Sequence, residues 1–311
     1  MVSLLQSSLP KGWGRCPRHL AIGAVCAYAG GMNLTIRPMT LSDLEVALGW
    51  ARDEGWNPGL DDAGAFYAQD PGGFLMGWLG TVRIGCISVV RYGSDFAFLG
   101  LYIVHPAHRG KGYGKAIWDA GIASAAGRTI GLDGVVAQQD NYRKSGFVFA
   151  HKSVRWGGSL RGLVTTRSFV RPIEVTDMDA VLSYDSKHVA ADRQRFLKAW
   201  LAPSPSRQTE GYFEDGTLRG FGTIRRCVAG WKIGPLFADT PAIAETLLAT
   251  LVTPTATDMI FIDMPEPNHA AAAMARRLGL TPAFETARMY LGAAPHLLLD
   301  EIFGVTTLEL G

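Results

Sequence analysis

The stretch DFAFLGLYIVHPAHRGKGYGKAIW, residues 95–118, decides the fold. From Phe96 to Val104 it is apolar, aromatic and β-branched for long enough to form a buried strand. The strand must end at Pro106, because proline cannot donate the next hydrogen bond of a sheet. Glycines at 110, 112 and 114 follow, and then the small residues of a closely packed helix. The stretch therefore predicts a strand, a glycine turn and a helix.

A turn of this kind predicts a site for an anion. The first N–H groups of the helix have no acceptor within it, and that end of the helix carries partial positive charge. Backbone donors there can hold a pyrophosphate, with Arg109 and Lys111 adding charge. The predicted binding residues of the turn are Arg109, Gly110, Lys111, Gly112, Tyr113, Gly114 and Lys115.

Spacing separates three kinds of nucleotide site. A P-loop needs four residues between its first glycine and Gly-Lys, followed by Ser or Thr, but only three residues lie between Gly110 and Gly114, and Ala116 follows Lys115. A dinucleotide fingerprint needs its third glycine at position 115, where this chain has Lys115, and it lies in the first strand–helix unit of a domain, whereas this turn lies further along the chain. Arg-x-x-Gly-x-Gly remains, formed by Arg109, Gly112 and Gly114.

This pattern, after a strand that ends before a proline, resembles the acetyl-coenzyme A signature of the GCN5-related N-acetyltransferases (GNATs). The resemblance implies acetyl-coenzyme A as co-substrate, without a metal, and direct transfer of acetyl to a primary amine in a ternary complex. It also implies that strand backbone pairs with the pantetheine arm. The backbone residues concerned are Tyr102, Ile103 and Val104.

Residues 142–147, Tyr-Arg-Lys-Ser-Gly-Phe, resemble the Tyr-x-Lys-x-Gly-Phe segment of the same family. The resemblance implies that Tyr142 protonates the departing thiolate, which a phenol of pKa about 10 can do. Alternatively, Tyr142 only packs against the cofactor. The family often has an asparagine seven residues earlier, where this chain has Val135, so that contact is either missing or supplied by Gln138, Gln139 or Asn141.

Composition limits the classes of function. With 311 residues, 48% of them hydrophobic and 19% charged, the chain is expected to form two globular domains. Its net charge of +2 includes three basic residues within the first 31 positions, which contain no acids, so the remainder carries −1 (2 − 3). A nucleic-acid partner is therefore not expected. Four cysteines without a CxxC pair predict reduced thiols and neither a disulfide framework nor a zinc site.

Residues 1–31 predict a disordered extension. A basic segment followed by an apolar run and Ala27-Tyr28-Ala29 also resembles a secretory signal. The run is interrupted by glycine and too short to span a bilayer. Because acetyl-coenzyme A is a cytoplasmic metabolite, a cytoplasmic protein without a membrane partner is the expectation.

The second half repeats the first. Arg37-Pro38 is echoed by Arg171-Pro172 at an offset of 134, and two further landmarks recur at offsets of 136 and 133. This predicts a tandem α/β protein with domains at 32–158 and 165–311 and a linker at 157–163. Each domain should be GNAT-like, with a mostly antiparallel mixed sheet flanked by helices.

The second copy lacks the glycine turn. Thr240-Pro241 begins its helix instead, and Asn268 reads as a helix cap. The arrangement resembles tandem acetyltransferases whose degenerate C-terminal half closes the acceptor side of the cleft. Arg193 and Arg195 could then face the acceptor, and the candidate bases are the carboxylates of Asp61, Asp62 and Asp192.

The acceptor is expected to be a small-molecule or peptide amine, whose identity the sequence does not indicate, and neither does it indicate the oligomeric state. A coenzyme A-binding sensor or acceptor-binding module without turnover is the competing class. No metal is expected, since His105 and His108 flank a proline turn and their rings need not converge.

Overall fold

Strands from both halves of the chain join one mixed sheet, in a computed structural model that describes residues 25–27, 33–160, 163, 167–253 and 258–311. A short strand, β1 (Val25–Ala27), precedes the repeat and pairs with β2. The rest of the predicted N-terminal extension, residues 1–24 and 28–31, lies outside the described residues.

The first half contains ten main elements. They are β2 (Asn33–Pro38), α1 (Leu41–Asp53), α2 (Asp62–Gln69), β3 (Phe74–Leu79), β4 (Val82–Tyr92), β5 (Phe96–Val104), α3 (Tyr113–Ser124), β6 (Thr129–Val135), α4 (Gln139–Lys144) and β7 (Val148–Gly158).

The second half follows the same order and adds one strand. Its elements are β8 (Val170–Pro172), α5 (Met178–Asp185), α6 (Gln194–Trp200), β9 (Arg207–Glu214), β10 (Thr217–Arg226), β11 (Trp231–Ala238), α7 (Pro241–Val252), β12 (Ile260–Pro265), α8 (His269–Arg277), β13 (Thr281–Leu291) and β14 (Ile302–Gly304). The predicted α/β duplication is confirmed element by element.

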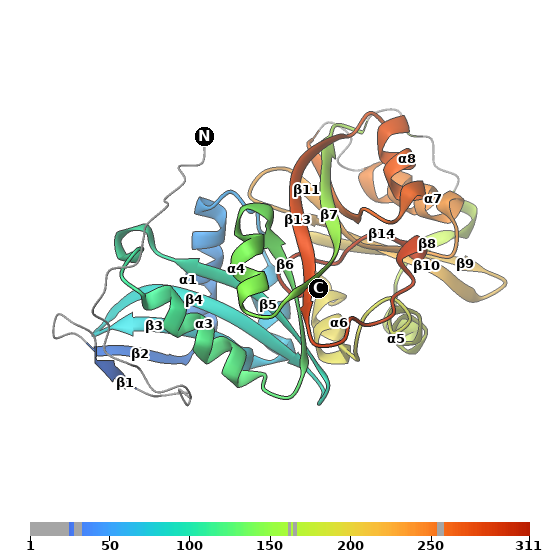
Figure 1. Ribbon diagram of the computed structural model, residues 1–311. Helices are drawn as coiled ribbons and strands as arrows, with labels where there is room; N and C mark the ends of the chain where they lie inside the picture. The colour runs from blue at the N-terminus through green and yellow to red at the C-terminus, as the bar shows by residue number, and fades with distance from the viewer. Residues whose placement is uncertain (1–24, 28–32, 161–162, 164–166, 254–257) are drawn as a thin grey trace.

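The last strands of the two halves are exchanged. The sheet order is β6-β13-β7-β12, so β13 lies against β6 of the first half and β7 lies against β12 of the second (Figure 1). All three contacts are antiparallel. The predicted domain boundary therefore divides the sequence but not the sheet. The linker expected at 157–163 was placed too early, because Gly157 and Gly158 still belong to β7.

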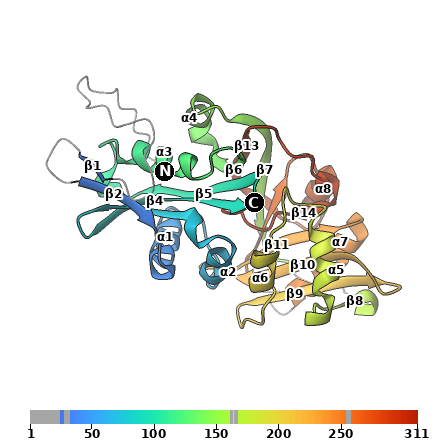
Figure 2. The same ribbon diagram turned by 90° about the horizontal axis from the view of Figure 1, so that it is seen from below.

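Helices cover both faces of the first-half strands, with α1 and α2 on one side and α3 and α4 on the other (Figure 2). Helix α1 shows why the chain folds in this way. Thr40 and Asp43 form a reciprocal capping box at its start, and its apolar stripe is buried against the sheet. The stripe consists of Leu44, Ala47, Leu48 and Ala51, whose spacing in the sequence predicts one face of a helix. None of the helices in the described ranges is long and apolar enough to cross a bilayer.

Buried ion pairs join the exchanged strands. Arg155 on β7 donates to both carboxylate oxygens of Asp263 on β12, at 2.7 and 2.9 Å. Arg288 on β13 does the same to Asp133 on β6, at 3.0 and 2.6 Å. Burial is the largest single effect on Asp263 and disfavours its ionisation, but the charge and hydrogen bonds of Arg155, together with two further buried cations, outweigh it, and the pKa of Asp263 is lowered.

Asp263→Ala should destabilise the protein by about 3–5 kcal/mol, because it leaves the buried guanidinium of Arg155 without its partner. Since the pKa of Asp263 is depressed in the folded state, this contribution is present above the unfolded pKa of about 3.9 and is lost as pH falls further. Urea unfolding at pH 7 and pH 3 measures both effects.

Glu245→Ala is the matched control, since Glu245 pairs with Arg277 at the surface, at 2.6 Å. Its free energy of unfolding should change little. Equal losses for the two variants would contradict the role assigned to the buried pair.

Candidate functional site

The glycine turn lies between β5 and α3, as the sequence predicts. Gly110 and Gly112 adopt left-handed backbone conformations, with φ of 74° and 82°. Gly112 occupies the N-cap of α3, where it makes no side-chain hydrogen bond to the helix. Because the N-cap glycine has no side chain, it cannot accept hydrogen bonds from the first N–H groups of α3. An incoming anion can accept them instead.

The corresponding helix of the second half has a different start. Thr240 caps α7, and its hydroxyl accepts a hydrogen bond from the N–H of Ile243 at 3.3 Å. A side chain thus occupies the place where an anion would bind. This contrast supports an anion site at α3 and not at α7.

The basic residues of the turn contact the protein itself. Arg109 donates from Nε to the carbonyl of Val104 at 2.8 Å and pairs through Nη2 with Glu54 at the end of α1. Lys111 donates to the carbonyl of Ala107 at 2.9 Å. These bonds brace the turn, so the direct phosphate contacts predicted for Arg109 and Lys111 remain predictions. Lys115 pairs with Asp119 one helical turn away.

Strands β5 and β6 separate just before the turn. Their parallel pairing ends at Leu99 and Leu132, and beyond this point β6 keeps, among the described residues, only its pairing with β13 on the opposite edge. Strand β5 continues along β4, with a register shift opposite Ile87 and an unusual φ of 44° at Leu101. Within the described residues, no strand pairs with the edge of β5 that faces away from β4 between residues 100 and 104.

Strand alternation decides which residues offer backbone groups at this open edge. The N–H of His105 donates to Ile84 on β4, so Ile103 also directs its N–H and C=O toward β4. Tyr102 and Val104 direct theirs away from β4. Of the three predicted pantetheine contacts, these two are oriented for pairing.

Tyr142 lies on α4, with its ring stacked on Trp118 at a centroid distance of 5.8 Å. Gly134 makes this position possible, since a Cβ there would lie 2.1 Å from the tyrosine ring. Tyr102 packs edge-on against the same Trp118, at 5.2 Å. Burial raises the pKa of Tyr142 to about 12, so its hydroxyl is protonated at neutral pH and can donate.

Two predicted bases lie in the contact between the halves. Asp61 accepts hydrogen bonds from Ser204 and Ser206, which lower its pKa. Asp62 is buried, accepts from the N–H of Gly59 and lies 3.3 Å from the guanidinium of Arg225. The lowered pKa makes Asp61 a poor proton acceptor. The contacts of both residues support an interface role better than the predicted base role.

Asp192 is exposed at the start of α6, where it accepts from the N–H of Gln194 at 2.8 Å. It borders a surface cavity of about 400 Å³ together with Arg195. Its neighbour Arg193 points inward and pairs with Asp185 at 2.9 and 2.6 Å. Arg195 and Arg193, which the sequence predicts to face the acceptor, therefore line two separate cavities, the second of which is described below.

The position expected to carry an asparagine, Val135, ends β6. Asn141 donates to Gln138 at 2.7 Å, while Gln139 accepts from Arg143. The three polar residues that could replace the asparagine therefore lie on α4 and on the turn before it, where each takes part in a hydrogen bond within that segment.

The structure adds residues that the sequence did not indicate. Arg288 and His151 lie next to each other on β13 and β7 and line a second cavity, between the halves. Only the strand exchange brings them near β5, and no local pattern marks it. No group of three or more potential metal ligands occurs in the part of the chain that the structure describes, and the rings of His105 and His108 lie 5.9 Å apart.

Both halves match models of known families. The model described as acetyltransferase (GNAT) family matches residues 41–147, and the model described as acetyltransferase (GNAT) domain matches residues 181–304. The holothin acyltransferase of Pseudoalteromonas sp. (strain SANK 73390) is 31% identical over 279 residues, which cover 89% of this chain and 94% of that protein.

Solved structures show the same fold. A putative acetyltransferase from Pyrococcus horikoshii superposes with a TM-score of 0.77 at 23% identity, covering 92% of this chain and 98% of that one. A tandem GNAT protein from the clavulanic acid biosynthesis pathway superposes with a TM-score of 0.60 at 15% identity, covering 84% and 99%.

Gly112→Asp should abolish most of the affinity for acetyl-coenzyme A, because it places a carboxylate and a strained left-handed residue where a pyrophosphate would bind. Isothermal titration measures the dissociation constant, for which we expect an increase of at least 100-fold.

Gly93→Asp is the matched control, since Gly93 has a similar φ of 64° in open space between β4 and β5. It should cost similar stability without affecting binding. Wild-type affinity in a folded Gly112→Asp protein would exclude the turn as the binding site.

Proposed function

Because the chain belongs to the GNAT family of acetyltransferases, in its tandem form, and is an acyltransferase, we propose that it transfers acetyl from acetyl-coenzyme A to a primary amine. The observation that carries this proposal is the juxtaposition of a helix start without a side-chain cap, at Gly112, with the open edge of β5. Backbone donors at the first and backbone pairing at the second suit a pyrophosphate followed by an arm containing amides.

The residues present fit such a co-substrate. Position 114 has room for glycine only, since a Cβ there would lie 2.7 Å from the hydroxyl of Tyr102. Tyr102 and Val104 present their backbone groups at the open edge. When bound, acetyl-coenzyme A supplies an acetyl group activated as a thioester, and the protein positions it.

Transfer forms a bond from the amine nitrogen to the carbonyl carbon and breaks the bond from that carbon to sulfur. The nitrogen loses a proton and the sulfur gains one. Tyr142 is the proposed donor to sulfur, because burial keeps its hydroxyl protonated. Bringing both reactants together in one complex can lower the barrier by about 7–11 kcal/mol.

The second half, together with the exchanged strand β7, is proposed to position the loop between α1 and α2. The backbone carbonyls of Trp56 and Asn57 in this loop accept hydrogen bonds from Arg155 on β7 and Lys232 on β11, at 3.1 and 2.9 Å. The side chain of Asn57 also exchanges two hydrogen bonds with the backbone of Ala229. These contacts support a role in holding the acceptor side of the site, in place of a second cofactor site.

Thiol release from acetyl-coenzyme A with a panel of small amines and peptides tests the proposal. Holothin, the acceptor named for the relative of 31% identity, belongs in that panel. Release that depends on an amine supports acetyl transfer. Binding of acetyl-coenzyme A without release in the presence of any amine would favour a binding module.

Tyr142→Phe should lower turnover by roughly 10²–10⁴-fold with the affinity for acetyl-coenzyme A unchanged, because it removes the donating hydroxyl and retains the stacked ring. Since the pKa of Tyr142 is about 12, wild-type turnover should show no loss from this group up to about pH 10. Steady-state kinetics and titration measure the two effects.

Tyr102→Phe is the control within the same aromatic cluster. It should reduce turnover far less. Equal losses in the two variants, or unaltered turnover in Tyr142→Phe, would remove Tyr142 from the proposed step.

A further inference from the structure

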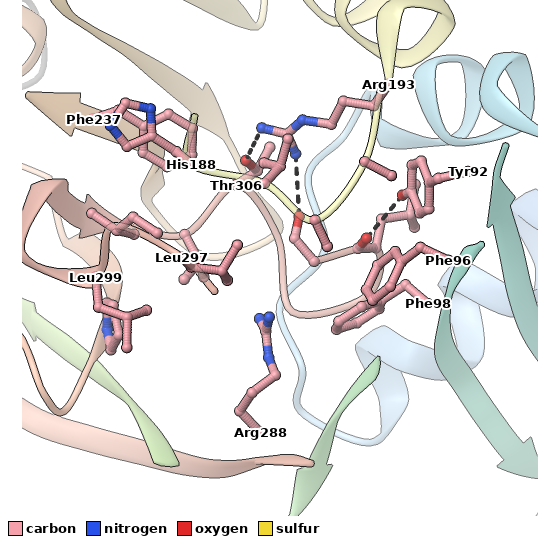
Figure 3. A pocket seen from close by; sticks show the side chains of 18 of the residues that line it. Tyr92, Phe96, Phe98, His188, Arg193, Phe237, Arg288, Leu297, Leu299 and Thr306 are labelled. Carbon is pink, nitrogen blue, oxygen red and sulfur yellow. Dashed lines mark hydrogen bonds between the residues drawn. The ribbon is translucent and has the colours of Figure 1, made fainter. Parts of the chain in front are cut away.

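A cavity of about 50 Å³ lies between the two halves of the molecule (Figure 3). Tyr92, Phe96 and Phe98 line it from the first half, and Phe237 and Leu297 line it from the second. Most of its surface is therefore aromatic or aliphatic. A flat apolar group fits such a lining, since aromatic rings stack or meet edge to face.

The cavity lies on the side of β5 that faces away from α3. Phe96 and Phe98 belong to the core that contains α1 and α2, whereas Ala97 and Leu99 pack in the core with α3. Phe98 immediately precedes Leu99, the last residue of β5 that pairs with β6. An acceptor in the cavity would thus approach the strand separation from the face opposite α3.

The charges around the cavity disfavour an ammonium group. No Asp or Glu side chain lines it among the residues that the structure describes. Two guanidinium groups line the cavity, and each is paired with a buried carboxylate. Arg193 is paired with Asp185, and Arg288 is paired with Asp133. A buried cation without a counter-ion is costly, so a charged alkyl amine would be excluded.

His151 supplies a suitable acceptor for a neutral amine. Its Nδ1 lies 2.9 Å from the carbonyl oxygen of Lys152, which can only accept, so Nδ1 carries the proton and Nε2 carries a lone pair in the neutral ring. Burial lowers its pKa and nearby Arg288 lowers it further, against the opposing effects of the Lys152 carbonyl, Asp133 and Glu266. The imidazole is therefore neutral at pH 7.

We propose that this cavity binds the amine-bearing end of the acceptor and that the acceptor is an uncharged amine attached to a flat, apolar ring. The inference rests on the proposed function and names its substrate class. A cavity of this size is smaller than the roughly 150 Å³ that encloses benzene, so it takes one edge of the ring.

This substrate class removes the need for a carboxylate base. An alkyl amine of pKa about 10 is mostly protonated at neutral pH. An amine bonded to an aromatic ring shares its lone pair with the ring and is neutral. As its nitrogen bonds to the acetyl carbon and the bond from carbon to sulfur breaks, the nitrogen's proton passes to Nε2 of His151 and Tyr142 protonates the sulfur.

Two isomeric amines test the substrate class directly. We expect kcat/KM at pH 7 to be at least 10-fold higher for 4-methylaniline than for benzylamine, and to stay constant between pH 7 and 9 only for 4-methylaniline. A preference for benzylamine, or thiol release with neither isomer, overturns the inference. Release with any other amine of the panel leaves the proposed function intact, whereas release with none overturns that function as well.

Introducing a carboxylate should change the specificity. Leu297 lines the cavity and is half-buried, whereas the adjacent Leu298 is 37% exposed and does not line it. Leu297→Asp should raise the ratio of kcat/KM for benzylamine to that for 4-methylaniline at least 10-fold, and Leu298→Asp should leave the ratio unchanged. An unchanged ratio in folded Leu297→Asp, or the same change in both variants, overturns the inference.

The role of His151 has its own test. His151→Leu should lower kcat for 4-methylaniline at least 10-fold while the dissociation constant of acetyl-coenzyme A stays the same. Wild-type kcat in this variant would remove His151 from the step and would overturn that part of the inference.

Discussion

The separation of β5 from β6 depends on β13. Among the described residues, β6 pairs with β5 on one edge up to Leu132 and with β13 on its other edge from Ile130 to Val135. The buried ion pair of Asp133 with Arg288 holds the end of β6 to β13 just beyond the point where the pairing with β5 stops, since neither charge is stable in the core alone. The open edge of β5, where the co-substrate is proposed to bind, thus exists because a strand of the second half holds β6 away.

The same exchange explains why a second half without a glycine turn belongs to the molecule. Its strands supply the contacts of the exchanged β7, and its loops hold the segment between α1 and α2. Asn57 adopts a left-handed φ of 56° in that segment, a conformation that asparagine tolerates better than most residues. Loss of the turn at Thr240 therefore leaves the structural role of the second half unaffected.

Local patterns predicted much of this fold, and long-range pairing could not be predicted. The strand at Phe96–Val104, the turn and the stripe of α1 follow from residue type and spacing, and the structure contains them. Asn268 caps α8 as predicted, accepting from the N–H of Ala271. The exchange of β7 and β13 has no local signal, because the sequence of each strand is compatible with pairing to either neighbour. The cavity and His151 were missed for the same reason.

The carboxylates show how pairing limits chemistry. Asp61 and Asp62 have the right residue type for a base and lie at the start of α2, and residue type is all that the sequence shows of this role. In the folded chain, two serine hydroxyls lower the pKa of Asp61, and Asp62 is buried beside two guanidinium groups. The hydrogen bonds to Asp61 strengthen the interface and weaken this carboxylate as a proton acceptor, because both effects arise from the same stabilised charge. An interface built from acids in this way favours an acceptor that arrives already neutral.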